Sequence, residues 1–269
     1  MEMVLKIARE YRFGLVIGCQ NWKAVLLPCV LIIVWQCITA SGMVKPILLP
    51  APAQVIDSFI AMAYSGELAS HLGTSIVRVL EGFALAAILG VGLGIGLGIF
   101  PFMAELMEGV IGLFRPIPPI AWLPLSILWF GIEEGSKIFI ITIGSFFPIF
   151  INVLDGIRQT DHKYVELAKV LEVPRQKFIT KVIIPGALPF IISGLRVGLG
   201  YAWMCVVAAE LSAGMKGIGY MLTDARALAQ TDRVLVGMLT IGVVGKIMDS
   251  ILKAAEKKIV SWKESFTGV

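Results

Sequence analysis

Few residues in this sequence have the types and spacing that catalysis requires. The sequence contains no serine, histidine and aspartate set for nucleophilic catalysis, no HExxH zinc motif and no pair of carboxylates beside an obvious cleft. The nearest approach to a phosphate-binding loop is Gly245-Lys246. Ile247 follows it where a serine or threonine would bind magnesium, and no glycine stands at the required upstream spacing. The sequence therefore predicts no ATPase site and no enzyme.

The cysteines and histidines do not form a metal site either. His71 and His162 are far apart and have no partner at ligand spacing. No CxxC pair occurs, and most cysteines lie in or near the first apolar run, as small buried hydrophobic residues do. The four cysteines are Cys19, Cys29, Cys37 and Cys205. We expect no metal and no cofactor in this chain.

The composition is that of an integral membrane protein. Apolar residues make up 57% of the 269 residues and charged residues only 16%, whereas soluble proteins carry about 25% charged residues. The length permits about six membrane spans in one domain. The net charge of +4 is modest and does not suggest nucleic acid as a partner. In a membrane protein a basic excess more often reflects orientation.

Apolar runs define a topology of six spans. Most lysines and arginines fall in the segments that are inside if the N-terminus is inside, so both termini are expected in the cytoplasm. No cleavage motif follows the first run, which predicts a retained span rather than a signal peptide. We expect a cytoplasmic segment at 1–23, a transmembrane domain at 24–253 and a cytoplasmic tail at 254–269. The runs lie at 24–40, 83–100, 110–130, 138–154, 187–209 and 234–252.

Two of these runs are irregular. Gly90, Gly94 and Gly98 repeat every four residues, so they share one helix face and would let another backbone approach closely. The third run begins RPIPPIAWLP, and prolines remove backbone donors that hydrocarbon cannot replace. This segment therefore either lines a water-filled path through the protein or is a kinked element that only packs against other helices.

A charged, amphipathic island interrupts the apolar sequence at residues 166–185, ELAKVLEVPRQKFITKVIIP. Its basic residues indicate the cytoplasmic side. A short helix is expected, with Glu166 and Lys169 on its polar edge, Pro174 ending it and Pro185 marking the entry into the next span. Its apolar face would consist of Tyr164, Val165, Ala168, Val170 and Leu171.

The order of residues in this island, an acid-x-alanine start and a hydrophobic-x-hydrophobic-proline end, resembles the coupling loop of ABC importer permeases. The resemblance extends over roughly residues 45–250 and is to the nitrate-, sulfonate- and taurine-type permeases. The stretches that carry it are LPAP near Pro50, HLGTSIVRVLEGF at 71–83, LPLSILWFGI at 123–132, KIFIITIGSFFPIFIN at 137–152, IIPGALPFIISGLRVGLGYAW at 183–203 and AAELSAGMKGIGYML at 208–222.

The resemblance implies an all-α membrane protein with the type I ABC importer permease fold and a coupling helix between spans 4 and 5, in the loop 161–186. It implies a bacterial inner-membrane subunit that pairs with a second copy, two ATPase subunits that hold ATP and magnesium, and an extracytoplasmic solute-binding protein. The solute would be a small anion such as nitrate, an alkanesulfonate or taurine. The implied ATPase-coupling residues are Tyr164, Glu166, Leu167, Ala168, Leu171, Glu172 and Pro185.

The chain departs from the family pattern at two coupling positions. Glu172 stands six residues after the acid, where the family usually has glycine, and Leu167 replaces the usual middle alanine. Both changes are expected to alter the turn after the coupling helix.

Ionisable and bulky residues inside the spans are candidates for the solute pathway, because a charge in hydrocarbon costs several kcal/mol. Arg78 and Glu81 are three residues apart and could pair on one helix face. Snorkelling to the interface is an alternative role for Arg78 and Arg196. The candidates are Arg78, Pro118, Pro119, Trp122, Arg196, Trp203 and Glu210.

Two other classes of function remain open. A secondary, ion-coupled transporter would usually show an inverted repeat and broken spans in corresponding halves, and none is evident. A non-transporting membrane scaffold would not need the proline-rich third run or the charged island. The transmembrane subunit of an ATP-driven importer is therefore the leading hypothesis.

Overall fold

A computed structural model describes residues 22–160 and 162–260, and all regular elements in these ranges are helices. Residues 1–21 and 261–269 of the predicted terminal segments, with Cys19, lie outside them. The helices are α2 (Trp22–Ala40), α3 (Pro52–Tyr64), α4 (Glu67–Ile99), α5 (Pro101–Phe114), the 3-10 helix η1 (Pro119–Trp122), α6 (Leu123–Phe130), α7 (Glu134–Arg158), α8 (His162–Val170), α9 (Arg175–Phe178), the π-helix η2 (Ile179–Ile183), α10 (Ile184–Ala213), α11 (Ile218–Ala227) and α12 (Thr231–Ile259). The all-α prediction is confirmed.

Four helical segments of the described chain are long and apolar enough to cross a membrane: α4, α7, the continuous stretch Arg175–Ser212, and α12. A helix suits this environment because it satisfies its own backbone hydrogen bonds where no water is present. The predicted first span at 24–40 falls on α2, whose apolar part Leu26–Ala40 is shorter than a full span.

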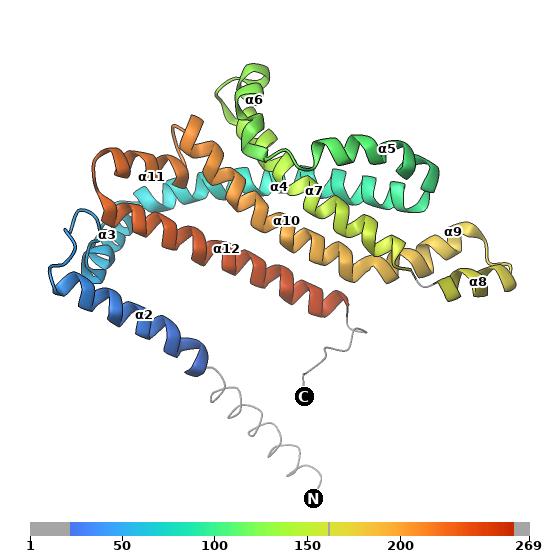
Figure 1. The fold of residues 1–269 in the computed structure, drawn as a ribbon, viewed down its shortest axis with the longest axis horizontal. Coiled ribbons are helices and arrows are strands. Elements are labelled where there is room, and N and C mark those ends of the chain that lie inside the picture. The colour runs from blue at the N-terminus through green and yellow to red at the C-terminus, as the bar shows by residue number, and fades with distance from the viewer. Residues whose placement is uncertain (1–21, 161, 261–269) are drawn as a thin grey trace, which may run out of the picture. The chain divides into compact units, whose positions relative to one another are not determined.

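The third predicted span, 110–130, is irregular, as its prolines predicted, and its helices begin earlier, at Pro101. The chain forms two segments, Pro101–Phe114 and Pro119–Phe130, bent by 84°. Pro116 and Pro118 lie between them and carry no backbone N–H, so the helix cannot continue through them. Figure 1 shows α6 turning away from the direction of α5. By length and composition the bent pair is at most one further span.

The chain divides into two compact units, and the smaller contains the residues up to Met62 together with Ala225–Val236. Side-chain hydrogen bonds connect its described segments. Trp35 Nε1 donates to the Pro50 carbonyl at 3.0 Å, and Thr231 Oγ1 donates to the Ile47 carbonyl at 2.5 Å. The Ser58 hydroxyl donates to the Asp232 carboxylate. These contacts join the loop after α2, the helix α3 and the first turn of α12.

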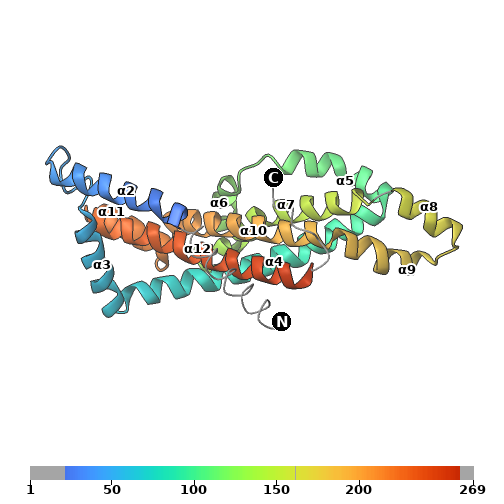
Figure 2. The same cartoon turned by 90° about the horizontal axis from the view of Figure 1, so that it is seen from below.

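The larger unit contains Ala63–Asp224 and the residues from Gly237 onward. In it α4, α7 and α10 run side by side, as both ribbon views show (Figures 1 and 2). Their contact is an apolar core centred on fully buried residues of α7 such as Ile141 and Ile149.

The glycine spacing in α4 serves this contact, as predicted. A Cβ on Gly90 would lie 2.9 Å from Ile149 Cγ2, and one on Gly94 would lie 2.8 Å from Val153 Cβ. Gly98 is equally close to Ile157, whereas a Cβ on Gly92 or Gly96 would meet nothing within 4 Å. Only the every-fourth-residue set therefore lets α7 approach the backbone of α4. The other two glycines do not take part.

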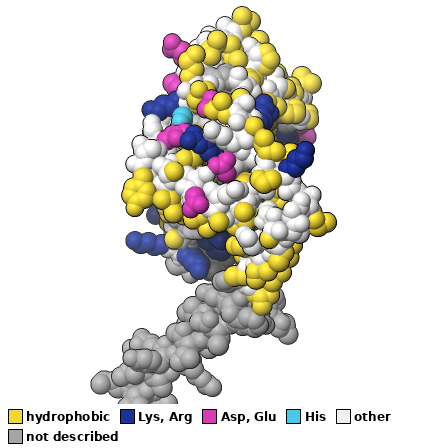
Figure 3. Space-filling model, turned by 90° about the vertical axis from the view of Figure 1, so that its left-hand side faces the viewer, with side chains coloured by type: hydrophobic (Ala, Val, Ile, Leu, Met, Phe, Trp, Pro, Cys, Tyr) yellow, Lys and Arg dark blue, Asp and Glu magenta, His cyan; other side chains and the backbone are white. Residues whose placement is uncertain are grey.

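Many large apolar side chains of the long helices point outward. Ile88 on α4 is 71% exposed and Ile251 on α12 is 62% exposed. Figure 3 shows one face of the molecule, on which hydrophobic side chains lie among acidic, basic and other ones. Exposed apolar surface of this extent on long helices fits contact with lipid.

Candidate functional site

The predicted coupling segment contains the short helix α8, and an apolar stripe on this helix is exposed. Tyr164, Leu167 and Leu171 are spaced as neighbours along one helix face, and each is more than half exposed. Val165 and Ala168 are half-buried, so they turn toward the protein rather than outward. The exposed stripe therefore includes Leu167, one of the two positions at which the sequence departs from the family pattern, and Val170 beside it.

Glu172 ends this helix in the backbone conformation that usually selects glycine. Its φ is +51°, in the left-handed region. The Glu172 N–H donates to the Lys169 carbonyl at 3.2 Å, and the Val173 N–H donates to the Ala168 carbonyl at 2.9 Å. These two bonds form a Schellman motif, in which the residue at the Glu172 position is left-handed. The turn expected with glycine is thus kept, with a glutamate in it.

Helix α9, the π-helix η2 and α10 follow Pro174 without interruption. The prediction that Pro185 marks the entry into the next span is refined: Pro185 lies in the first turn of α10, directly after the π-helix. A π-turn shifts the hydrogen-bond register before a proline that cannot donate. One helical rod therefore connects the turn at Glu172 with the centre of the larger unit.

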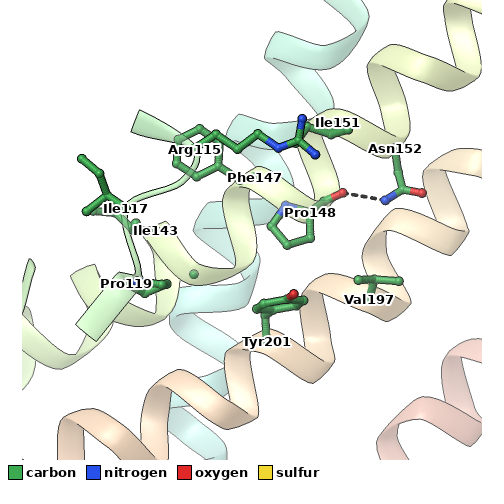
Figure 4. A pocket seen from close by; sticks show the side chains of 11 residues that line it. Arg115, Ile117, Pro119, Ile143, Phe147, Pro148, Ile151, Asn152, Val197 and Tyr201 are labelled. Carbon is green, nitrogen blue, oxygen red and sulfur yellow. Dashed lines mark hydrogen bonds between the residues drawn. The ribbon is translucent and has the colours of Figure 1, made fainter. Parts of the chain in front are cut away.

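A pocket of about 280 Å³ lies where the chain breaks after α5. Figure 4 shows its lining, which comes from the break, from α7 and from α10. Of the predicted pathway residues, Pro119 lines the pocket. Pro118 is exposed beside it, and Trp122 stacks on Phe114 with ring centroids 5.7 Å apart. The lining residues are Arg115, Ile117, Pro119, Ile143, Gly144, Phe147, Pro148, Ile151, Asn152, Val197 and Tyr201.

Arg115 is the charged residue that sequence reasoning missed. It ends α5 immediately before the proline cluster and extends along the pocket toward Ile151 (Figure 4). Its position at a predicted helix break inside an apolar run was a usable signal, because a cation there needs a reason to be tolerated.

Arg78 lies in a different place, within a buried network. Its Nε and Nη2 donate to the two carboxylate oxygens of Glu134 at 2.5 and 2.6 Å. Its Nη1 donates to Glu210 Oε1 at 2.7 Å and to the Lys216 carbonyl at 2.5 Å. The Arg78 side chain is 4% exposed. Arg78 therefore joins α4 to α7 and α10, and its donors are occupied by protein.

Glu210 completes this network from α10. It accepts hydrogen bonds from the Ser75 hydroxyl at 2.8 Å and from the Gly219 N–H at 2.8 Å, in the first turn of α11. Gly217, with φ +118°, lies so close that a Cβ there would come within 2.3 Å of the carboxylate. The stretch ELSAGMKGIG, residues 210–219, therefore folds back around the buried carboxylate of Glu210 and hydrogen-bonds to it.

One expectation about this region is corrected. Arg78 does not pair with Glu81, which is exposed, because Glu134 and Glu210 satisfy the guanidinium from other helices. The apolar run at 83–100 lies in α4, and this helix begins earlier, at Glu67. Ser75 and Arg78, in the part of α4 before the run, are both buried and paired.

The remaining two candidates have structural partners. Arg196 on α10 forms ion pairs with Asp249 at 2.9 Å and with Glu256 at 3.2 Å, both on α12. Trp203 is 5% exposed, and its Nε1–H points to Met248 Sδ at 3.3 Å. The structure thus does not gather the pathway candidates into one site: only Pro119 lines the pocket at the break.

Comparison with known proteins gives a consistent family assignment. Residues 88–261 match the family model described as binding-protein-dependent transport system inner membrane component. The chain is 43% identical, over 99% of its length and 95% of the relative's, to a putative aliphatic sulfonates transport permease protein of Bacillus subtilis (strain 168). It is 34% identical to the taurine transport system permease protein of Escherichia coli (strain K12), over 87% of this chain and 86% of that one.

A third relative is the nitrate import permease protein of Synechocystis sp. (strain PCC 6803), 33% identical over 86% of each chain. Among solved structures, an amino acid ABC transporter crystallised with histidines has a TM-score of 0.59, with 15% identity, over 76% of this chain and 98% of that one. At this identity the likeness concerns the fold alone. It confirms the predicted type I importer permease fold.

Proposed function

This chain belongs to the family of binding-protein-dependent transport system inner membrane components, the permease subunits of ABC importers, and we propose that its solute is an aliphatic sulfonate. The observation that carries the proposal is the 43% identity, over nearly the whole length of both chains, to a permease named for aliphatic sulfonates. Taurine and nitrate are the runners-up, since relatives named for them are less similar. The protein is a multi-pass inner-membrane protein.

The partners follow from the same assignment. Two copies of the chain form a twofold pathway, each binds one ATPase subunit that holds ATP and magnesium, and a solute-binding protein delivers the solute from outside. Both termini lie in the cytoplasm, as the distribution of lysine and arginine favours. Catalysis belongs to the ATPase, because the sequence of this chain carries no nucleotide-binding motif.

The ATPase binds the exposed stripe of α8. Tyr164, Leu167 and Leu171 offer an apolar face to a groove. The Schellman motif at Glu172 caps the C-terminus of α8, and after Pro174 one continuous helical stretch runs from Arg175 to Ala213 into the core. Movement of α8 is therefore passed on to α10 as a rigid-body displacement, which is what coupling of ATP binding to the spans requires.

Charge insertion into the stripe tests the ATPase contact. Leu167→Asp and Leu171→Asp should abolish co-purification of the ATPase in mild detergent and abolish uptake, because a carboxylate in an apolar groove is left desolvated and unpaired. Membrane insertion should be unchanged. Lys257→Asp, which adds the same side chain on the exposed last turn of α12, is the matched control. Normal uptake by both leucine variants would refute the assignment of α8.

Growth tests the solute. The importer with its binding protein is expressed in a host without sulfonate importers and supplied with ethanesulfonate or taurine as sole sulfur source, or nitrate as sole nitrogen source. Growth on ethanesulfonate is expected. Uptake that continues without the ATPase subunit would indicate a secondary transporter instead, and uptake of none of the three would refute the solute assignment.

A further inference from the structure

The pocket at the helix break lies near the middle of two long apolar helices that line it, α7 and α10. Its α7 residues run from Ile143 to Asn152, across the middle of Glu134–Arg158. Its α10 residues, Val197 and Tyr201, lie near the middle of the 30-residue helix Ile184–Ala213. We infer that these helices cross the membrane, so a hydrocarbon core about 30 Å thick places the pocket roughly 15 Å from the headgroups on either side. This depth separates the pocket from both surfaces.

Arg115 is a cation at this depth without a counter-charge from the described residues of its own chain. Among the described residues, the side chain of Arg115 forms no ion pair and no hydrogen bond, whereas Arg78 and Arg196 each pair with two carboxylates. Hydrocarbon does not tolerate a bare guanidinium, and the distance to the interface exceeds what an arginine side chain spans. Arg115 therefore faces water, an anion or both.

The other walls of the pocket indicate the kind of anion. Tyr201 and Asn152 bring a hydroxyl and an amide, and the Asn152 Nδ2–H bonds to the Pro148 carbonyl at 2.8 Å, which fixes its orientation (Figure 4). The remaining lining is largely apolar and includes Phe147 and Val197. One guanidinium, two neutral polar groups and apolar walls fit an oxyanion head with a short apolar tail.

We propose that this pocket binds an aliphatic sulfonate in mid-membrane, with Arg115 as the counter-charge of the sulfonate head and Tyr201 as a second hydrogen-bond donor. The proposal rests on the function proposed above and deepens it, because it assigns solute contact to residues of the permease itself. The apolar walls favour an alkyl tail over the ammonium of taurine, which would be desolvated there without a partner. A tail-less anion such as nitrate leaves these walls unused.

The effect of Arg115 on the electrostatic potential in the pocket can be measured by cysteine labelling, without a transport assay. Val197→Cys is placed in a chain whose native cysteines are replaced by alanine, and the complex with its ATPase is labelled in nanodiscs. Two methanethiosulfonate reagents are compared, one with a sulfonate and one with a trimethylammonium group. The anionic reagent is expected to react faster, and Arg115→Gln should lower the anionic-to-cationic rate ratio about tenfold. The second reporter is Tyr201→Cys. It is made in the chain that keeps its native cysteines, and the labelling of those cysteines is measured separately and subtracted.

Two results of this labelling would overturn the proposal. A rate ratio that Arg115→Gln leaves unchanged means that the guanidinium does not set the potential in the pocket. No reaction with either reagent at either reporter means that the pocket holds no water-accessible path. Ethanesulfonate should also slow the labelling of Val197→Cys about threefold or more when Arg115 is kept, and it should not slow this labelling when Arg115→Gln is added.

Uptake by proteoliposomes containing the whole importer gives the functional measurement. Arg115→Gln should lower the maximal rate of ethanesulfonate uptake at least tenfold and leave ATPase co-purification intact, and Arg115→Lys should restore part of it. Arg226→Gln removes the same charge from an exposed position outside the pocket and is the control. Wild-type rates in Arg115→Gln would overturn the site. If the unmodified importer moves no sulfonate while the labelling ratio still depends on Arg115, the solute assignment fails and the anion pocket stands.

Discussion

Arg78 Nη1 and Glu210 Oε1 lie 2.7 Å apart, although 132 residues separate them in the chain. The pair is almost completely buried and is closed on all sides by protein, since Glu134 binds the other face of the guanidinium and Ser75 donates to the carboxylate. It therefore fastens α4 to α10 and to the first turn of α11. Two residues that the sequence suggested as solute contacts act as a structural clamp.

Breaking this clamp should destabilise the protein. Glu210→Ala leaves Arg78, Ser75 and the Gly219 N–H with lost partners, which for a buried charge pair costs about 3–5 kcal/mol. The temperature at which the detergent-solubilised protein loses its monodisperse elution peak should fall sharply. Glu81→Ala removes an exposed carboxylate from the same helix as Arg78 and should change it little. Equal stability of the two variants would refute the clamp.

Substitution of glycine by alanine in α4 should have opposite effects on stability at a glycine that faces α7 and at one that does not. Gly94→Ala places a Cβ 2.8 Å from Val153 Cβ and 3.1 Å from the Phe150 carbonyl, so α7 must move, at a cost of about 1–3 kcal/mol. Gly96→Ala meets nothing within 4 Å and should be neutral or stabilising by up to ~1 kcal/mol, because alanine is the better helix former. The same elution assay ranks the two variants. A Gly94→Ala protein as stable as Gly96→Ala would contradict the packing.

Substitution of Glu172 by glycine should stabilise the turn that ends α8. A non-glycine residue in the left-handed region costs roughly 1 kcal/mol, and the φ of +51° places Glu172 there. Glu172→Gly should therefore slow hydrogen exchange at the Val173 amide, which closes the motif. Glu172→Val should speed it, since a β-branched residue fits this conformation poorly. Exchange of the Val173 amide that is the same in all three chains would show that the turn is not left-handed.

Arg196 and Asp249 should show an energetic coupling that links α10 to α12. Their bidentate pair has distances of 2.9 and 3.2 Å, and both side chains are partly exposed. Solvent screening limits the coupling to about 1 kcal/mol. The measurement is a double-mutant cycle of Arg196→Gln and Asp249→Asn on thermal stability. High salt should weaken the coupling, and strictly additive losses would exclude it.

Local pattern was enough for the larger part of the fold. Apolar runs located the long helices, and the spacing of Gly90, Gly94 and Gly98 identified the packed face of α4 before any partner was known. The charged island at 166–185 placed a short helix with its end before Pro174. These features depend on residues within one or two helical turns, and periodicity carries that information.

The sequence by itself determined the membrane class, the helical fold and, through its motifs, the family to which the chain belongs. Only the tertiary structure decided what the charged residues do. Arg78 takes its partners from α7 and α10 rather than from Glu81 one turn away, and Arg115 is left facing a pocket assembled from three separate segments. The physical reason is that the role of a buried charged residue depends on the groups that pack against it. These groups come from residues far apart in the chain, which only the tertiary structure brings together.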